Sequence, residues 1–151
     1  MKKLTKLILL PVSLTLGLAG CVGIGPNKTY VLTTTSFNYD PSYRPYMVKV
    51  NGYEVGGGYG SATMRSAVRL GPQIITWGED NSTRKHQAIN IVHLSKEELK
   101  NKSYLAVHLY PDDSVEITTS NDLPDPTQKG LDWMEHLIEQ NKQLLNKEYK
   151  K

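Results

Sequence analysis

The chain has 151 residues, of which 38% are hydrophobic and 22% are charged, a composition typical of a globular protein. Its 18 basic residues exceed its 15 acidic ones, but Lys2, Lys3 and Lys6 account for the whole excess. Without residues 1–20 the basic and acidic residues are equal in number, so the charge does not predict nucleic-acid binding. The only cysteine, Cys21, excludes an intramolecular disulfide.

Residues 1–20 predict a secretory signal. A basic start is followed by a mostly apolar run over residues 7–18, which is too short to span a membrane, and then by the small residues Ala19 and Gly20. We therefore exclude this segment from the fold. The rest divides into a glycine- and proline-containing tether over residues 21–29 and a single domain over residues 30–151.

The end of the signal, Leu18-Ala19-Gly20-Cys21, resembles the lipobox of bacterial lipoproteins. That resemblance implies cleavage between Gly20 and Cys21, with a diacylglycerol on the Cys21 sulfur and a further acyl chain on its amine. Three acyl chains hold a protein to a membrane far more firmly than one. Val22 follows the cysteine where inner-membrane lipoproteins have an aspartate, so the resemblance implies an outer-membrane anchor facing the periplasm.

The domain begins with a series of short β-strands, rich in β-branched residues or alternating in polarity. They are predicted over residues 30–35, 46–50, 53–55, 64–70, 73–77, 87–94, 104–110 and 115–119. Asn51-Gly52 predicts a type I′ hairpin turn, and Gly71-Pro72 predicts a turn between two strands. The alternation in residues 104–110 predicts one buried face.

Two helices are predicted. Ser95 and Glu98 have the spacing of a capping box and start a short helix that ends near Asn101. A longer helix runs from Gln128 or Gly130 to Glu148 and is amphipathic. We expect its apolar stripe to dock on the sheet; the stripe consists of Leu131, Met134, Leu137, Ile138, Leu144 and Leu145.

These elements predict a mainly β protein of the α+β class. The expected architecture is a small antiparallel β-sandwich or curved sheet, with a short mid-chain helix and a C-terminal amphipathic helix.

Catalytic and metal-binding patterns are not found in the sequence, so we expect no enzyme activity and no cofactor. There is no Gly-x-Ser-x-Gly elbow. We interpret the histidines as structural or solvent-facing, because none has metal-ligand spacing; they are His86, His93, His108 and His136. The aspartates are interpreted as turn formers; they are Asp112, Asp113, Asp122 and Asp125.

The glycine-rich stretch over residues 50–60 does not lead into the lysine and hydroxyl residue of a phosphate-binding loop. We interpret its glycines as a bulge or sheet corner where backbones approach closely.

Several motifs in order resemble a family of short bacterial lipoproteins whose domains have no assigned function. They are Phe37-Asn38-Tyr39-Asp40, Val48-Lys49-Val50-Asn51-Gly52, Gly56-Gly57-Gly58, Ile74-Ile75-Thr76-Trp77 and Val107-His108-Leu109-Tyr110-Pro111-Asp112. The similarity spans residues 30–122. Many members have a cysteine pair after the glycines, where this chain has Ser66 and Ala67.

Members of such families are often encoded beside phospholipase effectors of the type VI secretion system. The resemblance therefore implies an immunity protein that binds and neutralises such an effector in the periplasm. The alternative is an envelope structural or assembly lipoprotein that binds another outer-membrane or secretion component. A small-ligand binder or an unrecognised enzyme is a weaker third alternative.

The candidate partner-binding residues are tyrosines in or beside turns, because tyrosine supplies a large contact area at low entropic cost. We predict contacts by Tyr39, Tyr43, Tyr53 and Tyr59, with Arg65 as an additional anchor. Tyr46 belongs to the same tyrosine-rich stretch, and Arg69 is grouped with Arg65 as an anchor. The alternative interpretation is that several of these tyrosines are sheet residues with buried rings, and that the two arginines form only the solvated face of a strand.

Overall fold

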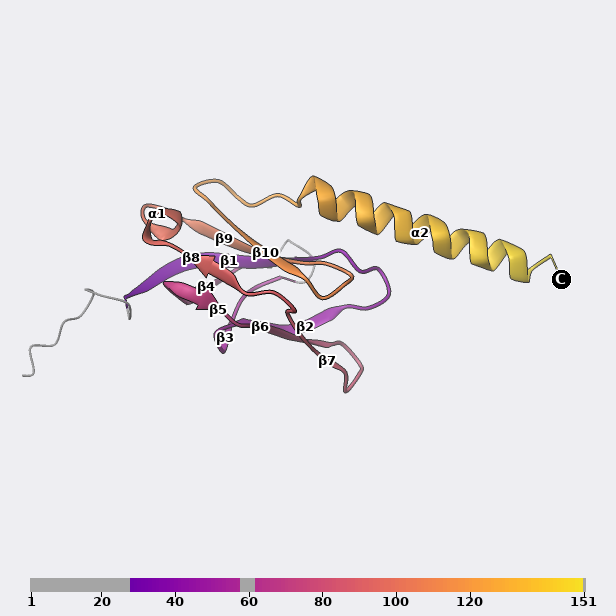
Figure 1. Ribbon diagram of the computed structural model, residues 1–151, viewed down its shortest axis with the longest axis horizontal. Helices are drawn as coiled ribbons and strands as arrows, with labels where there is room; N and C mark the ends of the chain where they lie inside the picture. Colours follow the sequence, from indigo (N-terminus) through magenta and orange to yellow (C-terminus); the bar gives the residue numbers. More distant parts are fainter. Residues whose placement is uncertain (1–27, 58–61, 151) are drawn as a thin grey trace, which may run out of the picture.

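A computed structural model describes residues 28–57 and 62–150 (Figure 1). The predicted signal, the predicted lipidation site Cys21 and the predicted contact residue Tyr59 lie outside the described residues. Within them, no helix is both long enough and apolar enough to cross a membrane.

Sheet A has four strands, in the order β10-β9-β1-β4. The strands are β1 (Thr29–Asn38), β4 (Met64–Arg69), β9 (Tyr104–Leu109) and β10 (Val115–Ser120). β1 pairs antiparallel with β4 but parallel with β9, which corrects the expectation of a wholly antiparallel fold. The parallel pair forms because sheets B and C lie between β1 and β9 in the chain, and this long connection returns β9 in the direction of β1.

Sheet B lies below sheet A in Figure 1 and has the order β3-β2-β6-β7. Its strands are β2 (Pro45–Val50), β3 (Tyr53–Glu54), β6 (Ile75–Glu79) and β7 (Lys85–Gln87). The β2–β3 turn has positive φ at Asn51 (50°) and Gly52 (82°), as a type I′ turn requires. Sheet C is the pair β5 (Gly71–Gln73) and β8 (Val92–Leu94).

The core fills the space between sheets A and B, which makes the fold a mainly β sandwich, as predicted. Its members from sheet A are Leu32, Val68, Leu105, Val107, Leu109 and Val115, and those from sheet B are Val48, Val50, Ile75 and Trp77. Leu94 and Leu99 close one end of this core. Along the strands of both sheets, inward-facing apolar residues alternate with outward-facing residues. Stability therefore comes from burial of the inward apolar side chains between the two sheets.

Two strands predicted as continuous are each split, because side chains distant in sequence hydrogen-bond at the breaks. At Ile74, the backbone N–H donates to Oδ1 of Asn51 (2.8 Å), so β5 leaves β6 and pairs with β8. The Gly71-Pro72 turn is thus part of a strand. Between β7 and β8, the Asn90 side chain pairs with the backbone N–H and C=O of Val115 at 2.8 and 2.9 Å, as a neighbouring strand would.

β9 is buried on both faces, so the prediction of one buried face is wrong. Leu105, Val107 and Leu109 face the core, and the opposite face is covered by a row of stacked aromatic rings. The row runs through Phe37, His108, Tyr39, Tyr110 and Trp133, with ring centroids 5.3 to 6.0 Å apart. Because Trp133 belongs to α2 (Gln128–Glu148), the row joins sheet A to that helix.

The first turn of α2 is fixed to this aromatic row. The Tyr39 hydroxyl accepts a hydrogen bond from the backbone N–H of Thr127 (2.8 Å), the N-cap residue of α2. Gly130 packs so closely on the Tyr39 ring that a Cβ at this position would overlap it. Helix α1 (Lys96–Leu99) has the predicted Ser95–Glu98 capping box but ends earlier than expected.

The rest of α2 extends away from the two sheets into solvent (Figure 1). Gly130 is its only buried residue, and four members of its apolar stripe are classed as exposed: Leu131, Ile138, Leu144 and Leu145. The prediction that this stripe docks on the sheet is therefore wrong. The N-cap bonds and the aromatic row direct the helix axis outward, and the outer face of sheet A is already covered.

We expect the protein to lose stability as the pH falls from 6.5 toward 4. Burial lowers the pKa of His108 from 6.5 to about 4, and the nearby Glu116 carboxylate opposes this shift only in part. Between these values the unfolded chain takes up a proton that the fold excludes. The free energy of unfolding should therefore fall by about 1.4 kcal/mol per pH unit, or about 3 kcal/mol in all.

Urea unfolding at pH 7, 5.5 and 4 measures this slope, and a His108→Gln variant, which cannot titrate, is the control. The wild type should show the full decrease in the free energy of unfolding. The decrease in the variant should be smaller by the contribution of the proton that His108 takes up on unfolding. Equal slopes for the two proteins would contradict the assignment.

Candidate protein-binding groove

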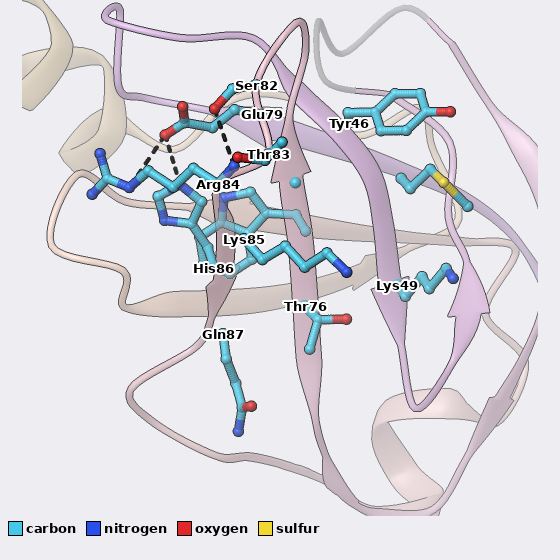
Figure 2. Close-up of a pocket in the computed structure, with 13 residues that line it drawn as sticks. Tyr46, Lys49, Thr76, Glu79, Ser82, Thr83, Arg84, Lys85, His86 and Gln87 are labelled. Carbon is cyan, nitrogen blue, oxygen red and sulfur yellow. Dashed lines mark hydrogen bonds and ion pairs between the residues drawn. The ribbon is translucent and has the colours of Figure 1, made fainter.

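A hollow of about 650 Å³ lies on the face of sheet B that points away from the core (Figure 2). The buried residues Val48, Ile75 and Trp77 alternate with Lys49, Thr76 and Gly78, which therefore point outward and line the hollow. β2 and β7 flank β6, and in Figure 2 Tyr46 and Lys49 of β2 lie on the opposite side of the view from His86 and Gln87 of β7. We call this hollow the sheet B groove.

The β2 side of the groove is shaped by a β-bulge. The β2–β6 register shifts between Tyr46 and Lys49, and Met47 has a φ of 48°. A positive φ is unfavourable for a large side chain such as methionine. The bulge exposes two adjacent large residues on the groove, Tyr46 at 57% and Met47 at 41%.

The floor of the groove is open because Gly78 lies at its centre. Gly78 pairs with Tyr46 on one side and with Lys85 on the other. A Cβ on Gly78 would have its nearest neighbour, the Tyr46 carbonyl oxygen, at 3.6 Å, which is ordinary van der Waals contact. The backbone conformation and contacts thus do not require a glycine at position 78. The effect of this glycine is to leave space between the side chains of Tyr46 and Lys85.

Under the β7 side lies His86, which is buried and bridges two carboxylates. Its Nε2 is 2.9 Å from Oε1 of Glu79, and its Nδ1 is 2.8 Å from Oδ1 of Asp113. The ring is stacked between Tyr43 and Trp77, with centroids 5.0 and 5.1 Å away. These contacts fix β7 against β6, so the wall of the groove is rigid.

The accessible charge in the groove is positive. Lys49, Arg84 and Lys85 line it, and the only carboxylate among the lining residues is Glu79, whose side chain is 13% exposed. Glu79 pairs with Arg84 at 3.6 Å and with His86. In the described part of the chain, Lys49 and Lys85 form no ion pair. An acidic partner surface would complement these two lysines.

The described residues contain no group of three or more histidine, cysteine, aspartate or glutamate side chains placed to hold a metal ion. Two of the four histidines are buried: His86 contacts carboxylates, and His108 contacts the Tyr39 hydroxyl and Thr118. His93 and His136 are exposed on β8 and α2.

Tyr39 lies in the interior, where a partner cannot reach it, which corrects its assignment as a contact residue. It is 2% exposed, and its hydroxyl is within hydrogen-bonding distance of Nδ1 of His108 (2.8 Å) as well as of the Thr127 N–H. Burial raises the pKa of the Tyr39 hydroxyl. This tyrosine stabilises the fold and the start of α2.

The other predicted contact residues are not gathered in one place. Tyr43 is half-buried, accepts a hydrogen bond from Nε1 of Trp77 (2.8 Å), and has its pKa raised to about 12 by burial. Tyr53 is 40% exposed on β3, where its hydroxyl accepts a hydrogen bond from Arg69. Arg65 is exposed on β4. Tyr53 and Arg65 are therefore accessible but lie outside the sheet B groove.

The glycines of residues 50–60 that the structure describes have the role the sequence predicts. A Cβ on Gly56 or Gly57 would overlap the backbone of Thr34 or Ser36, so this segment lies directly against β1. The Ser36 hydroxyl donates to the Gly56 carbonyl (2.9 Å). Gly56 and Gly57 are therefore sites of close backbone contact with β1.

Comparison with protein-family models, with curated proteins and with solved structures finds no match to this chain.

Sequence analysis did not identify the groove residues Met47, Lys49, Gly78 and Lys85. The alternation of Lys49 and Thr76 with apolar neighbours does indicate which residues face outward. The bulge at Met47 and the pairing of Gly78 with Tyr46 depend on strand register, which no local pattern specifies here.

We expect a Tyr39→Phe substitution to lower the free energy of unfolding by about 1–3 kcal/mol, because it leaves the Thr127 N–H and the buried Nδ1 of His108 without the Tyr39 hydroxyl. The matched control is Tyr53→Phe at an exposed site, which should change the value by less than about 0.5 kcal/mol. Urea unfolding measures both. A Tyr39→Phe protein as stable as the control would show that the buried hydroxyl does not hold α2.

Proposed function

We propose that this chain is a membrane-anchored periplasmic lipoprotein that binds and neutralises a phospholipase effector of the type VI secretion system. The single observation that carries the binding role is the sheet B groove. The anchor is supported by the Leu18-Ala19-Gly20-Cys21 motif, and the effector class by the family resemblance.

The lining of the groove supports a protein partner. Tyrosine, methionine and arginine are enriched at protein interfaces, and here Tyr46, Met47 and Arg84 line one open hollow. Tyr46 and Met47 are held outward by a strained bulge, so they are positioned before a partner arrives. Preorganised side chains bind more tightly because less entropy is lost on association.

The positive charge of the groove supports a partner segment that has carboxylates at its edges. Lys49 and Lys85 flank the bare floor at Gly78. We propose that a loop of the effector enters over Gly78, with its carboxylates beside the two lysines. Occupying the effector's active-site mouth or its lipid-binding surface neutralises it without any catalysis by this chain.

A lipid anchor at Cys21 would keep the groove near the membrane that a phospholipase attacks. β1 begins at Thr29, so the eight residues from Cys21 to Lys28 can extend at most about 30 Å. Confinement of both proteins near one surface raises their effective concentration. Placement of the groove near the membrane and binding of the effector would then both contribute to neutralisation.

A deletion strain lacking only this gene tests the function. We expect it to die in contact with parental cells whose type VI system is intact, and to survive when that system is disabled. Complementation with the wild-type gene should restore survival, and a Cys21→Ala version should restore it less well. Unchanged survival, with the neighbouring effector shown to be delivered, would contradict the immunity role and favour an envelope-assembly lipoprotein.

The groove itself is tested by variants of the purified chain, binding the phospholipase encoded beside its gene. Gly78→Val fills the floor without a backbone clash, and Tyr46→Ala removes an exposed ring. Each should weaken binding by about tenfold or more while leaving the thermal midpoint of unfolding nearly unchanged.

The matched control for Tyr46→Ala is Tyr53→Ala, which removes an exposed tyrosine outside the groove, and Arg65→Ala tests the same second surface. Both should bind as the wild type does. Weak binding by these two variants, with full binding by Gly78→Val, would place the contact on β3 and β4 instead.

A further inference from the structure

Helix α2 projects from the two sheets (Figure 1). Four members of its apolar stripe are exposed, whereas Met134 lines a hollow beside residues 40–45 of the same chain; the exposed members are Leu131, Ile138, Leu144 and Leu145. Exposure rises along the stripe, from 37% at Leu131 and 38% at Ile138 to 54% at Leu145 and 60% at Leu144. A helix of this length is only marginally stable in water without tertiary packing. The stripe is therefore expected to be covered by something other than the chain's own sandwich.

The stripe has the spacing of a coiled coil. Leu131, Ile138 and Leu145 recur every seven residues, and Met134 and Asn141 follow the first two by three residues. These are the a and d positions of successive heptads, which meet a partner helix. A polar residue at one such position, here Asn141, typically specifies register and number of helices. The surface thus fits another helix better than it fits a flat protein face.

The charges on α2 are separated by sign along the helix. Residues 128–139 contain Asp132, Glu135 and Glu139 against one lysine, whereas residues 140–150 contain Lys142, Lys147 and Lys150 against one glutamate. The helix dipole does not explain the acidic half, because the first turn has no acidic residue. Glu135 and Glu139 even repel each other at a spacing of four. Within the described residues, no α2 side chain forms an ion pair of 4 Å or less.

We propose that α2 pairs with α2 of a second copy in antiparallel orientation, forming a two-fold symmetric dimer of the lipoprotein. In an antiparallel coiled coil each a residue is level with a d residue of the partner, so Leu145 of each helix lies level with Met134 of the other. Glu135 then lies beside Lys142 of the second copy, on the flank of the same stripe. A parallel pair would instead place each acidic half beside another acidic half.

The shape of the molecule permits this pairing. α2 is attached to the sandwich only at its start, so the two sandwiches lie at opposite ends of the paired helices. Leu131 and Leu145 are separated by about 21 Å along the axis, at 1.5 Å per residue. The sheet B groove takes no part in the contact, so the dimer does not depend on the proposed effector binding.

An anionic membrane surface is the competing occupant, and the charge of α2 disfavours it. Helix α2 contains three lysines and four acidic residues, so its net charge is −1. Interfacial membrane helices are typically rich in lysine or arginine on the polar face. A second copy of α2 presents its own apolar stripe to the first stripe, and it places its basic half beside the acidic half of the first helix.

Sedimentation equilibrium of the full chain, in a density-matched detergent, tests self-association. We expect a monomer–dimer equilibrium that Ile138→Asp weakens by about tenfold or more. The matched control is Gln143→Asp, which introduces the same residue on the opposite face of α2 and should leave the equilibrium unchanged. Because Ile138 does not touch the sandwich core, thermal unfolding should show both variants folded.

A chain that is monomeric at every concentration would overturn the proposal. So would loss of the dimer in both variants, because the contact would then not depend on the stripe. A monomer that binds vesicles containing anionic phospholipid, and loses this binding on Ile138→Asp but not on Gln143→Asp, would assign the stripe to the membrane.

Disulfide cross-linking tests the orientation. Met134→Cys and Leu145→Cys chains, oxidised separately, should give no covalent dimer above the level of a chain without the added cysteine. An equal mixture of the two should give one. Cross-linking of Leu145→Cys with itself would indicate a parallel pair and overturn the antiparallel arrangement.

Discussion

Strand β1 is buried on both faces, and the rest of the structure is arranged around its contacts. The hydroxyls of Thr34, Thr35 and Ser36 donate to the carbonyl oxygens of Met64, Ala62 and Gly56 at 2.9 to 3.0 Å. These three residues are at most 1% exposed, so each buried hydroxyl needs such a partner. The chain from the glycine segment to β4 is therefore held along β1. Farther along the chain, Tyr39 binds the start of α2 in the same way, through a buried hydroxyl.

This arrangement leaves two surfaces that the sandwich does not use for its own stability. One is the outer face of sheet B, where a bulge and a glycine produce a groove lined by exposed apolar and basic side chains. The other is the apolar stripe of α2, directed away from the body by its anchored first turn. The groove suits the irregular surface of a different protein, whereas the periodic stripe suits a helix. We therefore propose different partners for them, an effector for the groove and a second copy for the stripe.

The two surfaces also differ in how they are supported. The groove lies on three hydrogen-bonded strands, and behind it His86 is clamped between two carboxylates and two aromatic rings. Its shape is thus fixed before a partner binds. The distal half of α2 has no tertiary support, so pairing would stabilise the helix as well as join two molecules. A membrane-anchored dimer would present two grooves, one on each sandwich.

The sequence by itself determined the class of the fold, most of its strands, the type I′ turn at Asn51-Gly52, the Ser95–Glu98 capping box and the bounds of α2. Each of these depends on the conformational preference or spacing of residues that are adjacent in the chain. Only the tertiary structure decided the parallel pairing of β1 with β9, the strand breaks at Ile74 and Asn90, the burial of Tyr39 and the outward direction of α2. Each of these depends on hydrogen bonds or ring contacts between residues far apart in sequence, such as Asn51 with Ile74 and Tyr39 with Thr127. The sheet B groove belongs to the second group, because strand register alone places Gly78 beside Tyr46.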